Sequence, residues 1–137
     1  MSSDWAGSGK SYTDFMKVQG NQVDFISIQY YNQGLYKDNP DNALFNIDSW
    51  ADGSSRRELV DAGIPKNKLV MGKPISEATA FSGFVPATTI QRAACRAHEE
   101  FGWDGGFMTW MYDTDLKEQA HNWSKELMTP CQPCDAV

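Results

Sequence analysis

The sequence predicts an α/β protein whose strands form a parallel sheet. Two observations carry this prediction. Three segments are rich in β-branched and aromatic residues, and segments of helical composition separate them. Strands that alternate with helices along a chain form βαβ units, in which the strands run parallel. The alternation alone fits an open doubly wound sheet and a closed barrel equally well.

The first predicted strand spans residues 23–32 and carries the most informative pattern. Successive strand side chains point to opposite faces, so Ile26 and Ile28 share an apolar face with the first of two tyrosines. The other face becomes polar at the carboxyl end, where Gln29 and Tyr31 stand. Ligands meet parallel sheets at this end of the strands. On residue types alone, a core strand with a satisfied glutamine is the simpler interpretation.

Helical segments flank this strand in the sequence. A helix is predicted to begin near Ser11, where a hydroxyl can cap it. Residues 44–62 also have helical composition; Gly53 can interrupt them, and Gly63 ends them. The second strand is predicted at residues 68–74, because this segment is short, apolar and closed by proline.

The rest of the chain repeats the alternation. Residues 86–101 predict a helix that a glycine ends, and residues 104–111 predict the third strand. Asp113 and Asp115 offer caps for a last helix that runs to about residue 128. This reading gives one unit over residues 1–128 and a tail with Cys and Pro over residues 129–137.

Composition excludes several classes of function. A length of 137 residues is enough for one domain with a core. The net charge of −6, without a basic stripe, argues against nucleic-acid binding. No apolar run is long enough to span a membrane, and the polar opening at Met1 lacks the apolar segment of a signal peptide.

The cysteines and histidines give little reason to expect a metal. Cys131 and Cys134 form one Cys-x-x-Cys in the tail, and Cys95 stands alone in a helical segment. A single such pair is weak evidence for zinc. His98 and His121 are most simply helix or surface residues. We therefore expect no metal and no cofactor, and we interpret Cys131 and Cys134 as a tail disulfide or as free thiols.

Four motifs in order give a more specific indication. They are Gln29-Tyr-Tyr-Asn32, IPKNKLVMGKP at residues 64–74, GFVP at residues 83–86 and GGFMTW at residues 105–110. With them, most of residues 18–128 resemble the C-terminal part of family 18 glycoside hydrolases, the chitinases and their relatives. The resemblance implies a partial (β/α)8 barrel, a fragment in which the three strands are the sixth to eighth.

The resemblance also implies a chemistry. Family 18 enzymes hydrolyse β-1,4-linked N-acetylglucosamine polymers with retention, by substrate-assisted catalysis, in which the acetamide oxygen of the sugar attacks. The match gives Tyr31 the catalytic role of holding the acetamide group. It gives substrate binding to Gln29, Asn32, Met108 and Trp110, the last as an aromatic floor beneath the sugar.

Two departures from the family leave the activity open. Lys73 replaces the apolar residue usual in the Gly-x-Pro strand, and the Asp-x-x-Asp-x-Asp-x-Glu run that bears the catalytic acid is not in this sequence. We therefore expect the chain to be inactive alone, because general acid catalysis contributes roughly 10²–10⁴-fold. The alternatives are a non-catalytic chitin- or N-acetylglucosamine-binding module and an unrelated α/β binding protein.

The expected partner is chitin or a chito-oligosaccharide, and the resemblance implies an extracellular, secreted protein. A piece of a barrel would leave its first strand as a sheet edge, with Ile26 and Ile28 exposed. We therefore expect self-association, pairing with a missing N-terminal half, or marginal stability.

Overall fold

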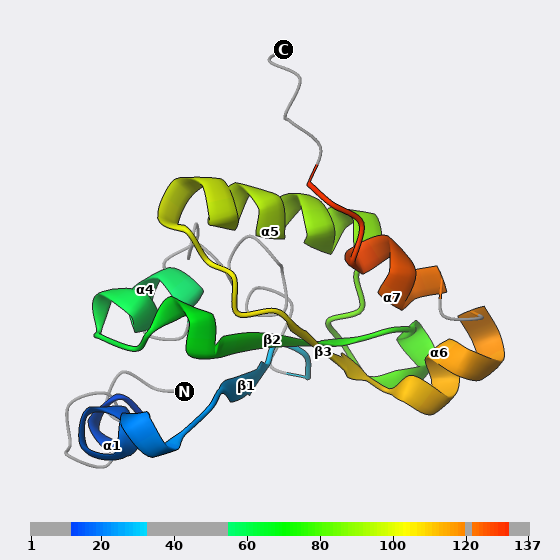
Figure 1. Cartoon of the computed structure of the whole chain (residues 1–137). Helices are drawn as coiled ribbons and strands as arrows, with labels where there is room; N and C mark the ends of the chain where they lie inside the picture. The colour runs from blue at the N-terminus through cyan, green and yellow to red at the C-terminus, as the bar shows by residue number, and fades with distance from the viewer. Residues whose placement is uncertain (1–11, 33–54, 120–121, 132–137) are drawn as a thin grey trace.

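A parallel three-stranded sheet organises the computed structural model, which describes residues 12–32, 55–119 and 122–131 (Figure 1). Its strands, in spatial order, are β1 (Ile26–Gln29), β2 (Leu69–Pro74) and β3 (Phe107–Trp110). Consecutive strands are neighbours, and both pairs are parallel. The prediction of an α/β fold with a parallel sheet is confirmed, although β1 and β3 are shorter than the predicted strands over residues 23–32 and 104–111.

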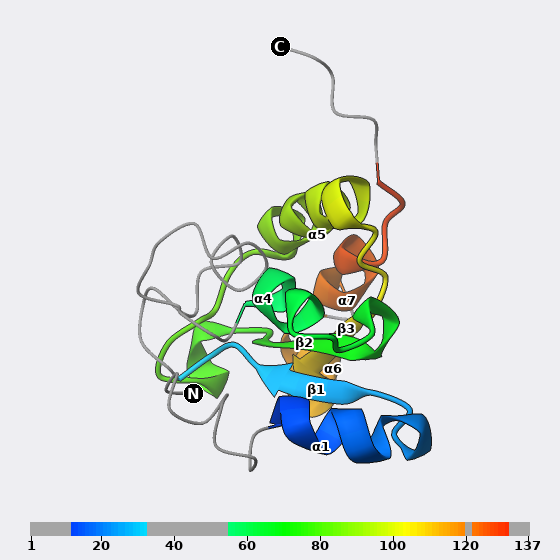
Figure 2. The ribbon, with the colours of Figure 1, turned by 90° about the vertical axis from the view of Figure 1, so that its left-hand side faces the viewer.

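Helices precede and follow each strand. In chain order they are α1 (Tyr12–Gln19), α4 (Arg56–Asp61), α5 (Ala87–Phe101), α6 (Tyr112–Gln119) and α7 (Asn122–Leu127). Short 3-10 turns lie at Gly20–Gln22, Lys66–Lys68 and Glu77–Thr79. Helices α4 and α5 lie over one face of the sheet, whereas α1 lies beside β1, far from α5 (Figures 1 and 2).

Local signals set the helix ends where the sequence predicts them. Ser55 caps α4, since its hydroxyl accepts from the Glu58 N–H while the Glu58 carboxylate accepts from the Ser55 N–H. Gly63 follows α4 with φ of 97°, and Gly102 ends α5 with φ of 66°, both in the left-handed region that glycine adopts without strain. Residues 44–54 of the predicted helix lie outside the described residues, as does Gly53.

The last predicted helix is divided and begins earlier than expected. Helix α6 starts at Tyr112, so Asp113 lies inside its first turn rather than before it. Helix α7 is a separate element, and residues 120–121, with His121, lie outside the described residues. Asp115 is 1% exposed, and its carboxylate accepts a hydrogen bond from the Ser124 hydroxyl. This carboxylate therefore joins α6 to α7.

The main core lies between the sheet, α5 and α7. Its buried members include Met71 of β2, Ile75 just after that strand, Ile90 of α5, and Trp103 and Trp123. Trp103 and Trp123 therefore pack in the core, and so does Tyr30.

A second, smaller core joins α1, α4 and the amino ends of β1 and β2. Its buried members are Met16, Leu59, Ile64 and Leu69, with Ile26 and Ile28 packed against them. Both isoleucines are half-buried, so the expectation that they are exposed is wrong. The reason is that the side of β1 that bears them faces this cluster rather than solvent.

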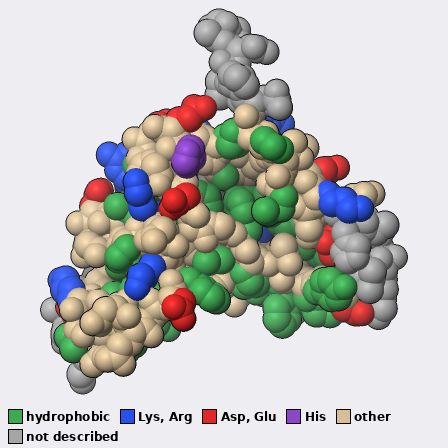
Figure 3. Space-filling view, viewed as in Figure 1, with side chains coloured by type: hydrophobic (Ala, Val, Ile, Leu, Met, Phe, Trp, Pro, Cys, Tyr) green, Lys and Arg blue, Asp and Glu red, His purple; other side chains and the backbone are tan. Residues whose placement is uncertain are grey.

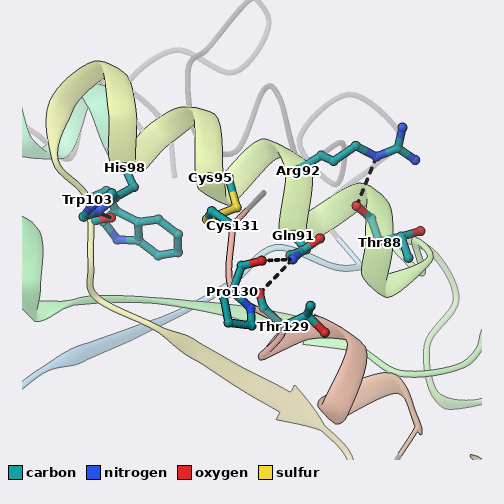
Figure 4. Close-up of a disulfide and its surroundings, with 9 residues drawn as sticks. All are labelled: Thr88, Gln91, Arg92, Cys95, His98, Trp103, Thr129, Pro130 and Cys131. Atoms are coloured by element: carbon teal, nitrogen blue, oxygen red, sulfur yellow. Dashed lines mark hydrogen bonds between the residues drawn. A yellow bond between two sulfur atoms is a disulfide. The ribbon is translucent and has the colours of Figure 1, made fainter. Parts of the chain in front are cut away.

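A disulfide corrects the interpretation of the cysteines. Cys131 bonds to Cys95 of α5, across 36 sequence positions, and not to Cys134, which lies outside the described residues (Figure 4). Beside it, Gln91 Nε2 donates to the Thr129 carbonyl at 2.7 Å. The first residues of the tail are thus fixed on α5.

Candidate functional site

The carboxyl ends of the strands bring several of the predicted residues to one face of the sheet. Gln29 pairs with Gly72, and Gly72 pairs with Met108, so these three positions lie in one row across the sheet. A Cβ added at Gly72 would stand 2.7 Å from Met108 Cε. The glycine therefore lets the half-buried Met108 side chain extend over β2.

Trp110 lies one step further along the same face. It pairs with Pro74, two residues beyond the Gly72–Met108 pair, and its side chain is 45% exposed. Its carbonyl accepts from the Ile75 N–H at 2.9 Å and from Thr79 Oγ1 at 3.2 Å. The peptide bond that follows Trp110 is cis. The indole is thus exposed while its backbone is fixed by the loop after β2.

Tyr31 stands just past the end of β1. The ladder continues beyond Gln29, because the Tyr30 N–H donates to the Gly72 carbonyl at 3.0 Å. Strand alternation continued to Tyr31 predicts that it shares the face of Gln29. Only 5% of Tyr31 is exposed, and burial raises the pKa of its phenol above the ordinary 10.0. This hydroxyl therefore keeps its proton at neutral pH.

The two amide side chains at this end contact the backbone. Gln29 is exposed, and its Nε2 donates to the Tyr31 carbonyl at 3.2 Å. Asn32 Oδ1 accepts from the N–H groups of Phe81, at 2.8 Å, and Ser82, at 3.2 Å. Asn32 also has φ of 58°, which asparagine tolerates better than most residues. Its side chain thus joins the end of β1 to the loop after β2.

The predicted site residues therefore come from two strands that flank β2. Neighbouring strands are spaced by about 4.8 Å, so the backbones that carry Tyr31 and Trp110 are separated by roughly 10 Å. Both lie at the carboxyl end of a parallel sheet, where α/β proteins bind ligands. Nearby exposed apolar residues are Met111, Tyr112 and Phe81. Figure 3 shows apolar side chains gathered along the lower margin of the molecule, over the sheet and α6.

Two buried cations lie behind this end of the sheet. Lys73 of β2 is fully buried and donates to the Tyr30 carbonyl at 2.7 Å. Arg56 is also fully buried, and its guanidinium carbon lies 5.0 Å from the Tyr30 ring centroid and 5.5 Å from that of Trp103. Its guanidinium nitrogens have no hydrogen-bond partner among the described residues, and both rings lie within the distance of a cation–π contact.

Burial sets the ionisation of these groups. It lowers the pKa of Arg56 to about 10, against a smaller opposing effect of Tyr30, so the guanidinium stays charged at neutral pH. It raises the pKa of the Tyr30 phenol, and Arg56 opposes this shift. Sequence reasoning missed Arg56, for which no local pattern exists. It noted Lys73 only as a departure from the family, although a lysine inside an apolar strand is itself a signal.

Other kinds of site find little support in the part of the chain that the structure describes. Within residues 12–32, 55–119 and 122–131, no group of three or more His, Cys, Asp or Glu side chains is arranged to hold a metal ion. His98 is exposed, as predicted. No helix of these ranges is both long enough and apolar enough to cross a bilayer.

A known protein similar to this chain is a chitinase, in line with the resemblance that the sequence motifs indicate. Over 102 residues the chain is 31% identical to Chitinase 1 of Candida albicans, a match that covers 66% of the chain and 20% of that protein. No protein-family model matches the sequence.

Two solved structures share the fold. A family 18 chitinase from Pseudoalteromonas aurantia superposes with a TM-score of 0.65 at 24% identity, over 83% of this chain and 38% of that one. A fungal endo-β-N-acetylglucosaminidase of glycosyl hydrolase family 18 gives a TM-score of 0.60 at 25% identity, over 85% of this chain and 36% of that one. The chain thus spans about a fifth of the curated relative and little more than a third of the solved structures.

The ordered motifs, the parallel sheet and these relatives point the same way: this chain is similar to the chitinase-like glycoside hydrolases of family 18 and corresponds to a part of them.

Proposed function

We propose that this chain forms part of a chitinase-type glycoside hydrolase, and that it supplies the Tyr31 and Trp110 side of a site for β-1,4-linked N-acetylglucosamine. The sheet would then be a section of a (β/α)8 barrel that includes its sixth to eighth strands. One observation carries the proposal. The Tyr31 turn and the exposed Trp110 flank the carboxyl end of β2, where Trp110 pairs with Pro74.

The chemistry of these groups suits substrate-assisted hydrolysis. The attacking group in that reaction is the acetamide oxygen of the sugar itself. A hydroxyl donor that orients the acetamide group favours this attack, and the neutral, buried phenol of Tyr31 is such a donor. The half-exposed indole of Trp110 offers a flat apolar surface for the apolar face of a pyranose ring. Gln29, Asn32 and Met108 would border this ring.

The proposal assigns no general acid to this chain, since the acidic motif is not in its sequence. We therefore expect no measurable turnover of a fluorogenic chitobiose substrate by the purified chain. Turnover that disappears in Tyr31→Phe, and persists in the matched control Tyr12→Phe on α1, would contradict this expectation. Tyr12 suits the control because it is half exposed and belongs to a helix away from the carboxyl ends of the strands.

A non-catalytic binding module is the second candidate. Two observations favour it: Trp110 is exposed, and the motif that bears the catalytic acid is not in this sequence. Titration of chitotriose against intrinsic tryptophan fluorescence tests binding without turnover. Trp110→Ala should weaken binding by roughly tenfold, since an aromatic contact contributes about 0.5–1.5 kcal/mol beyond its area. Phe15→Ala on α1, which removes a similarly exposed aromatic ring, should leave the affinity unchanged. If the parent chain, Trp110→Ala and Phe15→Ala bound chitotriose equally well, both the chitinase-type site and the binding module would be refuted.

We also propose that the protein is secreted. The Cys95–Cys131 disulfide supports this, because structural disulfides persist in oxidising compartments and are rare in the cytosol. The proposed partners are chitin or chito-oligosaccharides, and further copies or further βα units that would cover the edges of the sheet.

A further inference from the structure

Lys73 occupies a position that should be apolar. It lies on the helix-facing side of β2, between Met71 and Ile75, both of which belong to the main core. None of its side chain is exposed. A lysine is almost never fully buried without partners, because its ammonium group must be hydrogen-bonded. The bond from Lys73 Nζ to the Tyr30 carbonyl, at 2.7 Å, is therefore a contribution that no apolar residue could make here.

This carbonyl belongs to the peptide unit that leads directly into Tyr31. The N–H of Tyr30 is also held, since it donates to the Gly72 carbonyl. Both backbone polar groups of Tyr30 are thus bonded to β2: its N–H bonds to the Gly72 carbonyl, and its carbonyl bonds to the Lys73 side chain. The direction in which the chain enters Tyr31 is fixed from the core side of the sheet.

Asn32 fixes the chain on the other side of Tyr31. Its Oδ1 accepts two N–H groups, and its own N–H donates to the Ser82 carbonyl at 3.2 Å. These three bonds hold a residue whose φ of 58° turns the chain sharply after Tyr31. The Asn32 oxygen is committed to the backbone of the loop after β2, so it is not available to bind a sugar hydroxyl group.

We propose that Lys73 and Asn32 are positioning residues that hold the backbone on either side of Tyr31 and thereby set the direction of the Tyr31 side chain. Lys73 acts through the Tyr30 carbonyl and Asn32 through the loop at Phe81 and Ser82. The consequence for glycan binding rests on the proposed function. The effect on Tyr31 itself does not, so the two can fail separately.

Nitration of tyrosine by tetranitromethane, mapped by tandem mass spectrometry on the full chain, tests the role of Lys73. The buried Tyr31 should react slowly, and the exposed Tyr112 serves as the internal reference. Lys73→Met should speed nitration of Tyr31 relative to Tyr112 by about tenfold, the effect of losing one charge-assisted hydrogen bond. Lys68→Met is the matched control, because Lys68 Nζ donates to the Val23 carbonyl, at 2.6 Å, near the amino end of β1. It should leave the ratio unchanged.

Substitutions of Asn32 test the other anchor and remain informative if Lys73→Met does not fold. Asn32→Asp keeps an oxygen acceptor and tolerates positive φ, so Tyr31 should stay protected. Asn32→Gly keeps the backbone conformation but removes the acceptor, and nitration of Tyr31 should rise by several-fold. A purely structural role would show as lower thermal stability without a change specific to Tyr31.

The proposal is overturned if Tyr31 reacts no faster, relative to Tyr112, in Lys73→Met and Asn32→Gly than in the parent chain. It is also overturned if Lys68→Met exposes Tyr31 to the same extent. Chitotriose titration of the same proteins separates the two hypotheses. A parent chain that protects Tyr31 but binds no glycan would refute the proposed function and leave the positioning roles standing.

Discussion

The Cys95–Cys131 disulfide should contribute a large part of the stability of this chain. It closes a ring across 36 sequence positions that includes β3, α6, α7 and the part of α5 that follows Cys95. Closing such a ring removes about 13 cal/mol/K of entropy from the unfolded chain, which corresponds to about 4 kcal/mol near room temperature. Without the bond, the tail keeps the Gln91–Thr129 hydrogen bond, which contributes only about 1 kcal/mol.

The measurement needs a background in which cysteines cannot exchange partners. Cys134→Ser provides it, and this variant should match the parent chain in urea unfolding, because Cys134 is not part of the bond. Adding Cys131→Ala to it should lower the free energy of unfolding by about 2–4 kcal/mol. Cys131 is exposed, so its replacement leaves no cavity. A loss below about 1 kcal/mol, or a peptide map that joins Cys131 to Cys134, would refute this reasoning.

Three further outcomes are expected. Gly105→Ala should destabilise the fold by about 3 kcal/mol in urea unfolding, because the added Cβ would clash with the Leu69 carbonyl oxygen. Gly20→Ala is the control and should cost little, since its added Cβ would stand 3.4 Å from the nearest atom. In an alkaline titration of phenolate absorbance, Tyr31→Phe should remove signal that appears at higher pH than that of an ordinary tyrosine, since burial raises the pKa of Tyr31 above 10.0. The stability tied to the neutral phenol is complete below the ordinary pKa and is lost as the pH rises through the raised one. Sedimentation should show self-association that Phe15→Ser weakens, and a monodisperse parent monomer that melts cooperatively would contradict this.

Elements fixed by local chemistry were predictable from the sequence. The alternation in residues 26–29 appears in the structure as alternating burial, and the apolar run before Pro74 is β2. Gly63 and Gly102 end helices because each adopts positive φ. These features depend on a few adjacent residues, so the sequence alone contains their cause.

Features that depend on distant residues were not predictable. The pairing of Cys95 with Cys131 requires the tail to return to α5, and a Cys-x-x-Cys spacing gives no sign of this. No glycine or proline in the sequence indicates that α6 and α7 are separate helices. In the candidate site, the resemblance to family 18 rather than residue types singled out Tyr31 and Trp110, and it gave a substrate-binding role, which stays a prediction, to Asn32. Its bonds to a loop 49 and 50 positions away could not be read from its neighbours.

The loop after β2 contacts both aromatic sides of the candidate site. Thr79 bonds the Trp110 carbonyl, and Phe81 and Ser82 bond Asn32, next to Tyr31. Substitutions in this loop should therefore be epistatic with changes at either aromatic residue, and double-mutant cycles between them should be non-additive. A change in this single segment would therefore alter both sides of the candidate site at once, without replacement of either aromatic ring.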